Sequence, residues 1–159
     1  MVGQSVLKLR PDVTITPLTV EHAANMYHWM GDPLVAHNLG LRSEPSLEKT
    51  RSWITHALQD PLIQPWAELL NEQHVGNVIL DRIDNYLATA RMSVYIGESL
   101  ARGGGVGLTG IYLALSTGFK NLNLYKIWLT VHTRNYPAIN AYTRLGFVQE
   151  GLLRGEFWL

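Results

Sequence analysis

A run of glycines after a strand-like segment is the feature of this sequence that most directly indicates chemistry. The run spans Arg102-Gly103-Gly104-Gly105-Val106-Gly107 and leads into an amphipathic segment. Glycine has no Cβ, so the backbone N–H groups of such a loop are accessible to a ligand. At the first turn of a helix these donors and the helix dipole favour an anion, and a diphosphate suits them. The alternative is that the glycines only form the turn at the start of the helix.

Two nucleotide-binding loops share features with this run, and the sequence argues against both. Gly105, Gly107 and Gly110 match G-x-G-x-x-G, but the dinucleotide fingerprint also requires an Asp or Glu about 20 residues downstream. No acidic residue occurs between Gly107 and Glu150. A Walker A loop requires Gly-Lys-Ser or Gly-Lys-Thr, which the sequence lacks.

The N-terminal part of the chain is expected to supply a helical layer. Alternation and helical spacing predict a strand, two helices and an irregular segment between the helices: 13–16, 20–30, 46–58 and 34–45. Thr19 is the expected N-cap of the first helix, with His22 in the place of the usual Glu. Four aromatic side chains could line an acceptor cleft or belong to the core: Trp29, Trp53, Trp66 and His37.

A three-stranded meander and a helix–strand–helix unit follow. The predicted meander strands are 66–70, 75–80 and 88–96, and the later elements are a helix over 108–119, a strand over 125–131, a helix over 135–145 and a last strand beginning at 147–150. In the third meander strand, Met92, Val94 and Ile96 share one face, and Arg91, Ser93 and Tyr95 share the other. We expect an α+β (mixed α/β) fold in a single domain, 1–159, rather than a doubly wound sheet.

Two pieces of the sequence together resemble the GNAT superfamily of N-acetyltransferases. Arg102, Gly105 and Gly107 match Arg-x-x-Gly-x-Gly, the family's pyrophosphate motif. Segment 135–147 is similar to the family's N-x-x-A-x-x-x-Y-x-x-x-G-F helix. The resemblance is strong over 88–155 and loose over 13–87. It implies a mostly antiparallel, twisted central sheet with a V-shaped splay between its fourth and fifth strands, flanked by about four helices.

The resemblance also implies where acetyl coenzyme A (acetyl-CoA) binds. The backbone of the fourth strand at Val94, Tyr95 and Ile96 is expected to pair with the pantetheine arm. The diphosphate is expected on the loop formed by Arg102, Gly103, Gly104, Gly105, Val106, Gly107 and Leu108. Asn135 matches a coenzyme-contacting position, and Tyr142 matches the tyrosine beside the coenzyme sulfur. The expected partners are acetyl-CoA and an amine, with no metal, nucleic acid or membrane.

A thioester is already activated, so the implied reaction needs no covalent nucleophile. The amine attacks the carbonyl, and N–H groups near Val94 to Ile96 are the expected oxyanion donors. A phenol has a pKa of about 10 and a thiol about 8.5, so Tyr142 stays protonated and can give its proton to the leaving sulfur. The alternative for Tyr142 is a core tyrosine packed on its own helix.

The general base and the acceptor are less sharply defined. Some relatives carry Glu where this sequence has Thr130, which leaves His132, Glu98 and Asp81 as candidates. An α-amino group of pKa about 8 is roughly a tenth neutral at pH 7, against about one part in 2,500 for an alkylamine near 10.4. We therefore favour a protein N-terminus or an amino sugar. The alternatives are a polyamine acceptor and a non-catalytic CoA-binding module.

Composition fits this class of enzyme. Lys plus Arg and Asp plus Glu number 13 each, so no charge bias favours nucleic acid or an anionic membrane. The absence of cysteine excludes disulfides and thiolate nucleophiles. A cytoplasmic location is expected, and a homodimer is compatible with the sequence. Members of the family continue into one more strand, so we expect a truncated chain or a strand supplied by a neighbouring chain.

Overall fold

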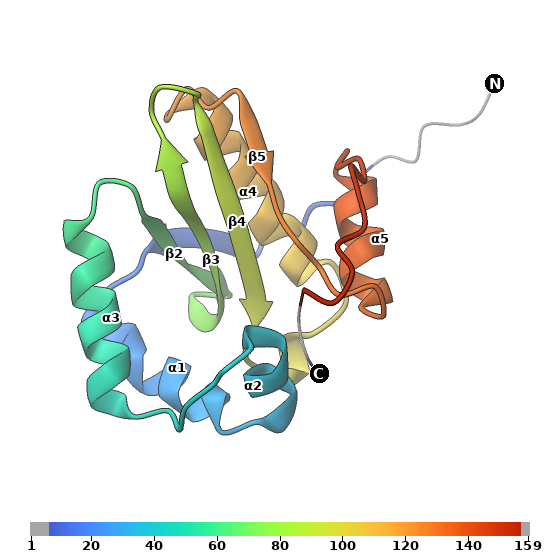
Figure 1. The fold of residues 1–159 in the computed structure, drawn as a ribbon. Coiled ribbons are helices and arrows are strands. Elements are labelled where there is room, and N and C mark those ends of the chain that lie inside the picture. The colour runs from blue at the N-terminus through green and yellow to red at the C-terminus, as the bar shows by residue number, and fades with distance from the viewer. Residues whose placement is uncertain (1–6, 157–159) are drawn as a thin grey trace. The chain divides into compact units, whose positions relative to one another are not determined.

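A computed structural model describes residues 7–156 of the chain (Figure 1). The larger of two compact units spans Leu9–Leu129, and the described part of the smaller one is 7–8 with 130–156. The single domain predicted over 1–159 stays a prediction. Within 7–156, no helix combines the length and apolarity that crossing a membrane would require.

The larger unit is built on a five-stranded sheet with the order β1-β2-β3-β4-β5. The strands are β1 (Val13–Pro17), β2 (Gln64–Leu70), β3 (Gln73–Asp84), β4 (Thr89–Ile96) and β5 (Lys126–Trp128). Strands β1 to β4 are antiparallel neighbours, and β5 is parallel to β4. The predicted mixed, mostly antiparallel sheet is confirmed.

Strands β4 and β5 separate soon after they meet. Their last paired residues are Arg91 and Trp128, after which β4 continues to Ile96. Among the described residues, none pairs with β4 beyond Arg91 on that side of the strand. This is the predicted splay. The strand predicted over 125–131 is wrong at its C-terminal end, because β5 stops at Trp128. A strand continues only as far as a neighbouring strand supplies backbone hydrogen bonds.

Helices cover both faces of the sheet (Figure 1). One face carries α1 (Ala23–Met30), α2 (Pro33–Leu39) and α3 (Leu47–Gln59), whose buried cluster includes Ala67 of β2. The next residue of β2, Glu68, points to the opposite face, where it lies against Gly110 of α4 (Val106–Lys120). Trp29 and Trp66 belong to the buried core rather than to an open cleft.

The first predicted helix begins as expected. A 3₁₀ turn, η1 (Val20–His22), precedes α1, and the N–H of Thr19 donates to Nδ1 of His22 at 2.9 Å. Histidine thus takes the place of the usual Glu of a capping box, as the sequence indicates.

Helix α2 lies in the segment that we predicted to be irregular, so that prediction is wrong. Asp32 is its N-cap and accepts the N–H of Leu34 at 2.9 Å, Pro33 lies in its first turn, and Gly40 ends it at φ 63°. These are ordinary start and stop signals, but seven residues show too little periodicity to indicate a helix. The described residues contain five α-helices rather than about four.

The ordered centre of the smaller unit is α5 (Tyr136–Arg144). After it, the N–H of Gly146 donates to the carbonyl of Thr143 at 3.1 Å, and that of Phe147 donates to the carbonyl of Tyr142 at 3.0 Å. Gly146 has φ 94°, so these bonds form a Schellman motif. The strand predicted to begin at 147–150 is wrong, because Phe147 caps the helix and the described residues after it form no strand.

A carboxyl group is buried between β2 and α4. Glu68 is 0% exposed, and neither of its side-chain oxygens has a hydrogen-bond partner among the described residues. A Cβ on Gly110 would overlap this carboxyl group. Burial raises the pKa of Glu68 to about 8, and the nearby Gly110 amide opposes that rise. Glu68 is therefore mostly protonated at neutral pH.

We expect Glu68→Gln to stabilise the protein increasingly as the pH rises. Between the ordinary pKa of 4.5 and about 8, native Glu68 keeps a proton that the unfolded chain has released. The free energy of unfolding therefore falls by up to about 1.4 kcal/mol per pH unit in this window. Urea unfolding from pH 5 to 9 measures this, with exposed Glu72→Gln as control. Parallel pH profiles for wild type and Glu68→Gln would contradict the expectation.

Candidate functional site

The predicted coenzyme-binding residues of the larger unit lie in the last residues of β4 and in the segment that follows it. The strand ends at Ile96, a 3₁₀ turn, η2 (Ser99–Ala101), follows, and the glycine loop leads into α4. Gly103, Gly104 and Gly105 have φ values of 86°, 62° and 84°, which favour glycine. The side chains of Val106 and Leu108 are buried, so these two residues can offer a ligand only their backbone.

The first turn of α4 presents unpaired N–H donors. Its N-cap, Gly105, makes no side-chain capping bond. Within the described part of the chain, the amides of Gly107 and Leu108 have no backbone acceptor. A Cβ on Gly103 would meet no atom within 4 Å, so the loop borders open space. Free amides at the positive end of a helix fit the diphosphate of CoA.

The Arg102 side chain is engaged with the end of β4. Its Nε donates to the carbonyl of Ile96 at 3.1 Å, and its Nη2 donates to the carbonyl of Gly97 at 3.1 Å. Nη2 also lies 3.2 Å from Oδ2 of Asp32, at the start of α2. The guanidinium thus ties the turn after β4 to α2. The predicted binding of diphosphate at this residue stays a prediction, and it would rest on the backbone.

Trp29 of α1 packs over the same turn. The indole is 3% exposed, and a Cβ on Gly97 would overlap its ring. Its Nε1–H donates to Oε2 of Glu98 at 3.3 Å. The structure therefore holds Glu98, a candidate base, directly after β4. Asp81 is less available as a base, because both its oxygens accept bonds from Arg91, at 2.8 and 2.6 Å.

A buried chain of polar groups orients Tyr95 of β4. Asn77 is 0% exposed, its Nδ2 donates to the Tyr95 hydroxyl at 2.8 Å, and its Oδ1 lies 2.8 Å from Nε2 of His74. Burial lowers the pKa of His74 and raises the pKa of Tyr95 to about 12. Both groups are therefore uncharged at neutral pH. The network fixes a strand residue whose backbone is a predicted pantetheine contact.

The other predicted site residues belong to the smaller unit. The carbonyl of His132 accepts the N–H of Asn135 at 2.9 Å, and Oδ1 of Asn135 caps α5 by accepting the N–H of Ala138 at 3.4 Å. The Tyr142 ring lies 5.6 Å from that of Phe147. Burial raises the pKa of Tyr142 to about 12, so its hydroxyl stays protonated at neutral pH. Roles for these residues toward the coenzyme and the amine stay predictions.

Sequence reasoning missed the contacts of Asp32, His74 and Asn77. A signal for Asn77 was present, because it is a polar residue inside the apolar run 75–80. A buried amide needs hydrogen-bond partners, so such a residue indicates a polar network. No local pattern reveals the contact between Asp32 and Arg102, since the two lie far apart in the sequence.

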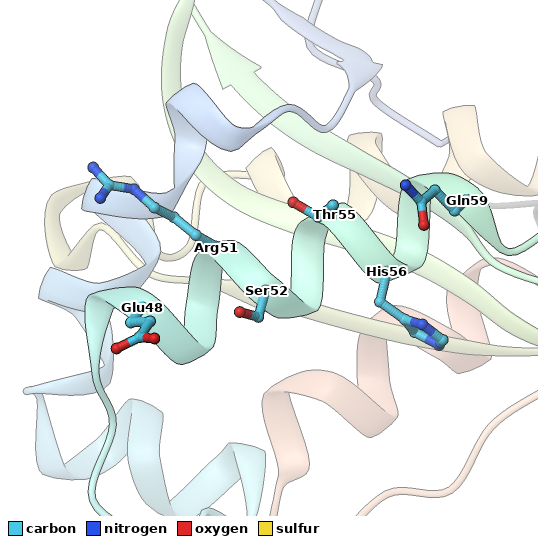
Figure 2. Close-up of a pocket in the computed structure, with 6 residues that line it drawn as sticks. All are labelled: Glu48, Arg51, Ser52, Thr55, His56 and Gln59. Carbon is cyan, nitrogen blue, oxygen red and sulfur yellow. The ribbon is translucent and has the colours of Figure 1, made fainter.

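A separate hollow of about 440 Å³ lies along α3 (Figure 2). Its lining comes from one helix: Glu48, Arg51, Ser52, Thr55, His56 and Gln59. None of the predicted site residues borders it, and we assign it no function. Within 7–156, no group of three or more His, Cys, Asp or Glu side chains could hold a metal ion.

We expect Gly97→Ala to weaken both the fold and coenzyme binding. The new methyl group would overlap the Trp29 ring, and overpacking of this kind costs about 1–3 kcal/mol. Displacement of the turn would also disturb the loop that follows it. Urea unfolding and calorimetric titration with CoA measure the two effects. Gly151→Ala is the matched control, because a Cβ there meets no atom within 4 Å. Equal behaviour of the two variants would contradict this account.

Comparisons with known proteins show the family to which the chain belongs. The family model described as acetyltransferase (GNAT) domain matches residues 12–148. Spermidine N(1)-acetyltransferase of Escherichia coli K12 is 28% identical over 157 residues, which cover 96% of this chain and 78% of that protein.

Two solved structures share the fold. The spermidine N-acetyltransferase from Vibrio cholerae in complex with CoA and spermine has a TM-score of 0.87 at 23% identity, covering 94% of this chain and 89% of that one. A dodecameric structure of the spermidine N-acetyltransferase from the same organism has a TM-score of 0.81 at 24% identity, covering 94% and 87%. Because the family match extends over most of the sequence, this chain belongs to the GNAT family of acetyl-CoA-dependent N-acetyltransferases.

Proposed function

We propose that this enzyme transfers the acetyl group of acetyl-CoA to a primary amine of a polyamine such as spermidine. The observation that carries the proposal is the similarity to spermidine N(1)-acetyltransferase over 96% of the chain. From the sequence alone we favour a protein N-terminus or an amino sugar, whereas the relatives support the polyamine alternative. A solved relative is dodecameric, and the homodimer stays a prediction for this chain.

The charges around the end of β4 suit a cationic acceptor. Arg102 bonds both Asp32 and the carbonyl of Gly97, and Trp29 contacts both Glu98 and Gly97. Two carboxyl groups, of Asp32 and Glu98, and one guanidinium group, of Arg102, therefore take part in these contacts. Hydrogen bonds from the Leu34 amide and from Arg102 lower the pKa of Asp32, so it stays ionised. A local excess of negative charge favours an alkylammonium group over a neutral sugar.

Only a small fraction of an alkylamine is neutral at pH 7, which disfavours a polyamine acceptor. The pKa of an alkylamine is about 2.5 units higher than that of an α-amino group, which makes its deprotonation cost about 3.4 kcal/mol more. Holding amine and thioester in reacting geometry can contribute about 7–11 kcal/mol. Positioning acts on either kind of amine, but it is larger than the protonation penalty, so a polyamine acceptor is compatible with the absence of a strong base in the fifth strand.

The reaction then proceeds by direct attack. The neutral amine adds to the thioester carbonyl, backbone N–H groups of Val94 to Ile96 stabilise the oxyanion, and the C–S bond breaks. The departing thiolate takes a proton from Tyr142, and the amine loses one to a base, for which Glu98 and His132 stay the predictions. The products are an acetamide and free CoA.

An acceptor screen tests the proposed substrate. We expect kcat/KM to be highest for spermidine or spermine, because a second ammonium group of these amines would be attracted by the carboxyl groups of Asp32 and Glu98. The screen includes nucleotide amino sugars and peptides beginning with Ser or Ala, with release of CoA thiol as the measurement. A higher kcat/KM for a peptide or an amino sugar would overturn the polyamine assignment. Binding of CoA without turnover of any amine would indicate the non-catalytic module instead.

Tyr142→Phe tests the proposed proton donor. We expect kcat to fall about 100-fold or more, as is typical when general acid catalysis is lost. The affinity for CoA should change little, and because the pKa of Tyr142 is about 12 the loss should be constant from pH 7 to 9. Tyr136→Phe on the same helix is the matched control, because Tyr136 is 66% exposed. Unchanged kcat in Tyr142→Phe would refute this role.

A further inference from the structure

A second arginine lies beside the glycine loop, and it comes from the N-terminal end of the larger unit. Nη1 of Arg10 is 3.3 Å from the position that a Cβ on Gly104 would occupy. The arginine of the sequence motif, Arg102, is occupied at the end of β4. We propose that the Arg10 guanidinium binds the diphosphate of acetyl-CoA together with the amides of Gly103–Leu108.

The backbone of Arg10 is fixed to the first turn of α4. Its N–H donates to Oγ1 of Thr109 at 3.0 Å, and that hydroxyl donates to the carbonyl of Gly105 at 2.7 Å. Thr109 is 2% exposed, so this junction is buried. Pro11 follows and restricts Arg10 to extended backbone conformations. Arg10 therefore keeps a constant position relative to the loop.

The side chain is oriented as well. Nε and Nη2 of Arg10 donate to the two oxygens of Asp12 at 3.0 and 2.8 Å, a bidentate pair that fixes the plane of the guanidinium. This leaves Nη1 as the nitrogen next to Gly104. Asp12 thus acts on the ligand only through Arg10, as a positioning residue.

The neighbourhood of Nη1 indicates which phosphate it binds. Gly104 lies one residue before the N-cap of α4, whose unpaired amides fit the diphosphate. A planar guanidinium can donate to phosphate oxygens with a fixed geometry and keeps its charge at any ordinary pH. The assignment concerns the diphosphate rather than the 3′-phosphate of CoA. Of the proposed function it requires only that the protein binds CoA, whichever amine is the acceptor.

Arg10→Gln tests the assignment by calorimetric titration without any amine. We expect the Kd for CoA to rise about tenfold, with an equal rise for dephospho-CoA, which lacks only the 3′-phosphate. For S-acetyl-pantetheine, which lacks every phosphate, the Kd should stay within about twofold of wild type. Arg10→Lys keeps the positive charge but lacks the planar guanidinium with its paired N–H donors. Its Kd for CoA should lie between those of wild type and Arg10→Gln.

Arg91→Gln is the matched control, because it also removes one charge and a bidentate pair, with Asp81 at 2.8 and 2.6 Å. Its Kd for CoA should stay within about twofold of wild type. The proposal is overturned by an unchanged Kd in folded Arg10→Gln, by a loss confined to CoA, or by an equal loss with S-acetyl-pantetheine. A failed polyamine screen would leave it intact, since no acceptor enters this titration.

Discussion

The separation of β5 from β4 is the constraint on which the candidate site depends. Their ladder ends at Arg91 and Trp128, and β4 then runs on to Ile96. Backbone N–H and C=O groups must find partners in the protein, in solvent or in a ligand. An open strand edge accepts an extended chain through main-chain hydrogen bonds, and the pantetheine arm of acetyl-CoA has that form. We therefore propose that the unpaired edge of β4 is the basis of coenzyme recognition in this protein.

Three contacts fix the turn that joins this edge to the glycine loop. Arg102 holds the carbonyls of Ile96 and Gly97, Trp29 covers Gly97, and Asn77 holds the Tyr95 hydroxyl. Because the contacts come from α1, β3 and the loop itself, the distance between strand edge and loop is set by packing on several elements. A ligand that spans both is then held at two points. Ordering of the site before binding reduces the entropy lost when the coenzyme binds.

Long periodic patterns in the sequence predicted most of the fold, because sheet strands and amphipathic helices each bury one face. Helix α2 was missed because it is short, and the strand at 147–150 was wrong because strands depend on distant partners. The loop was predictable since its glycines must adopt positive φ. The contacts of Arg102 with Asp32 and of Arg10 with the loop could not be predicted, because they join residues far apart in the sequence. Glu68 is an acid within an apolar strand, but the sequence alone did not lead us to predict that its carboxyl group is buried.

Hydrogen exchange of the backbone amides with and without CoA tests the central claim most directly. If the coenzyme occupies the open edge and the loop, amides of 92–96 and 103–108 should exchange more slowly in the complex, while those along α3 should not change. Protection confined to other segments, or unchanged exchange at the loop despite measurable binding, would contradict the account.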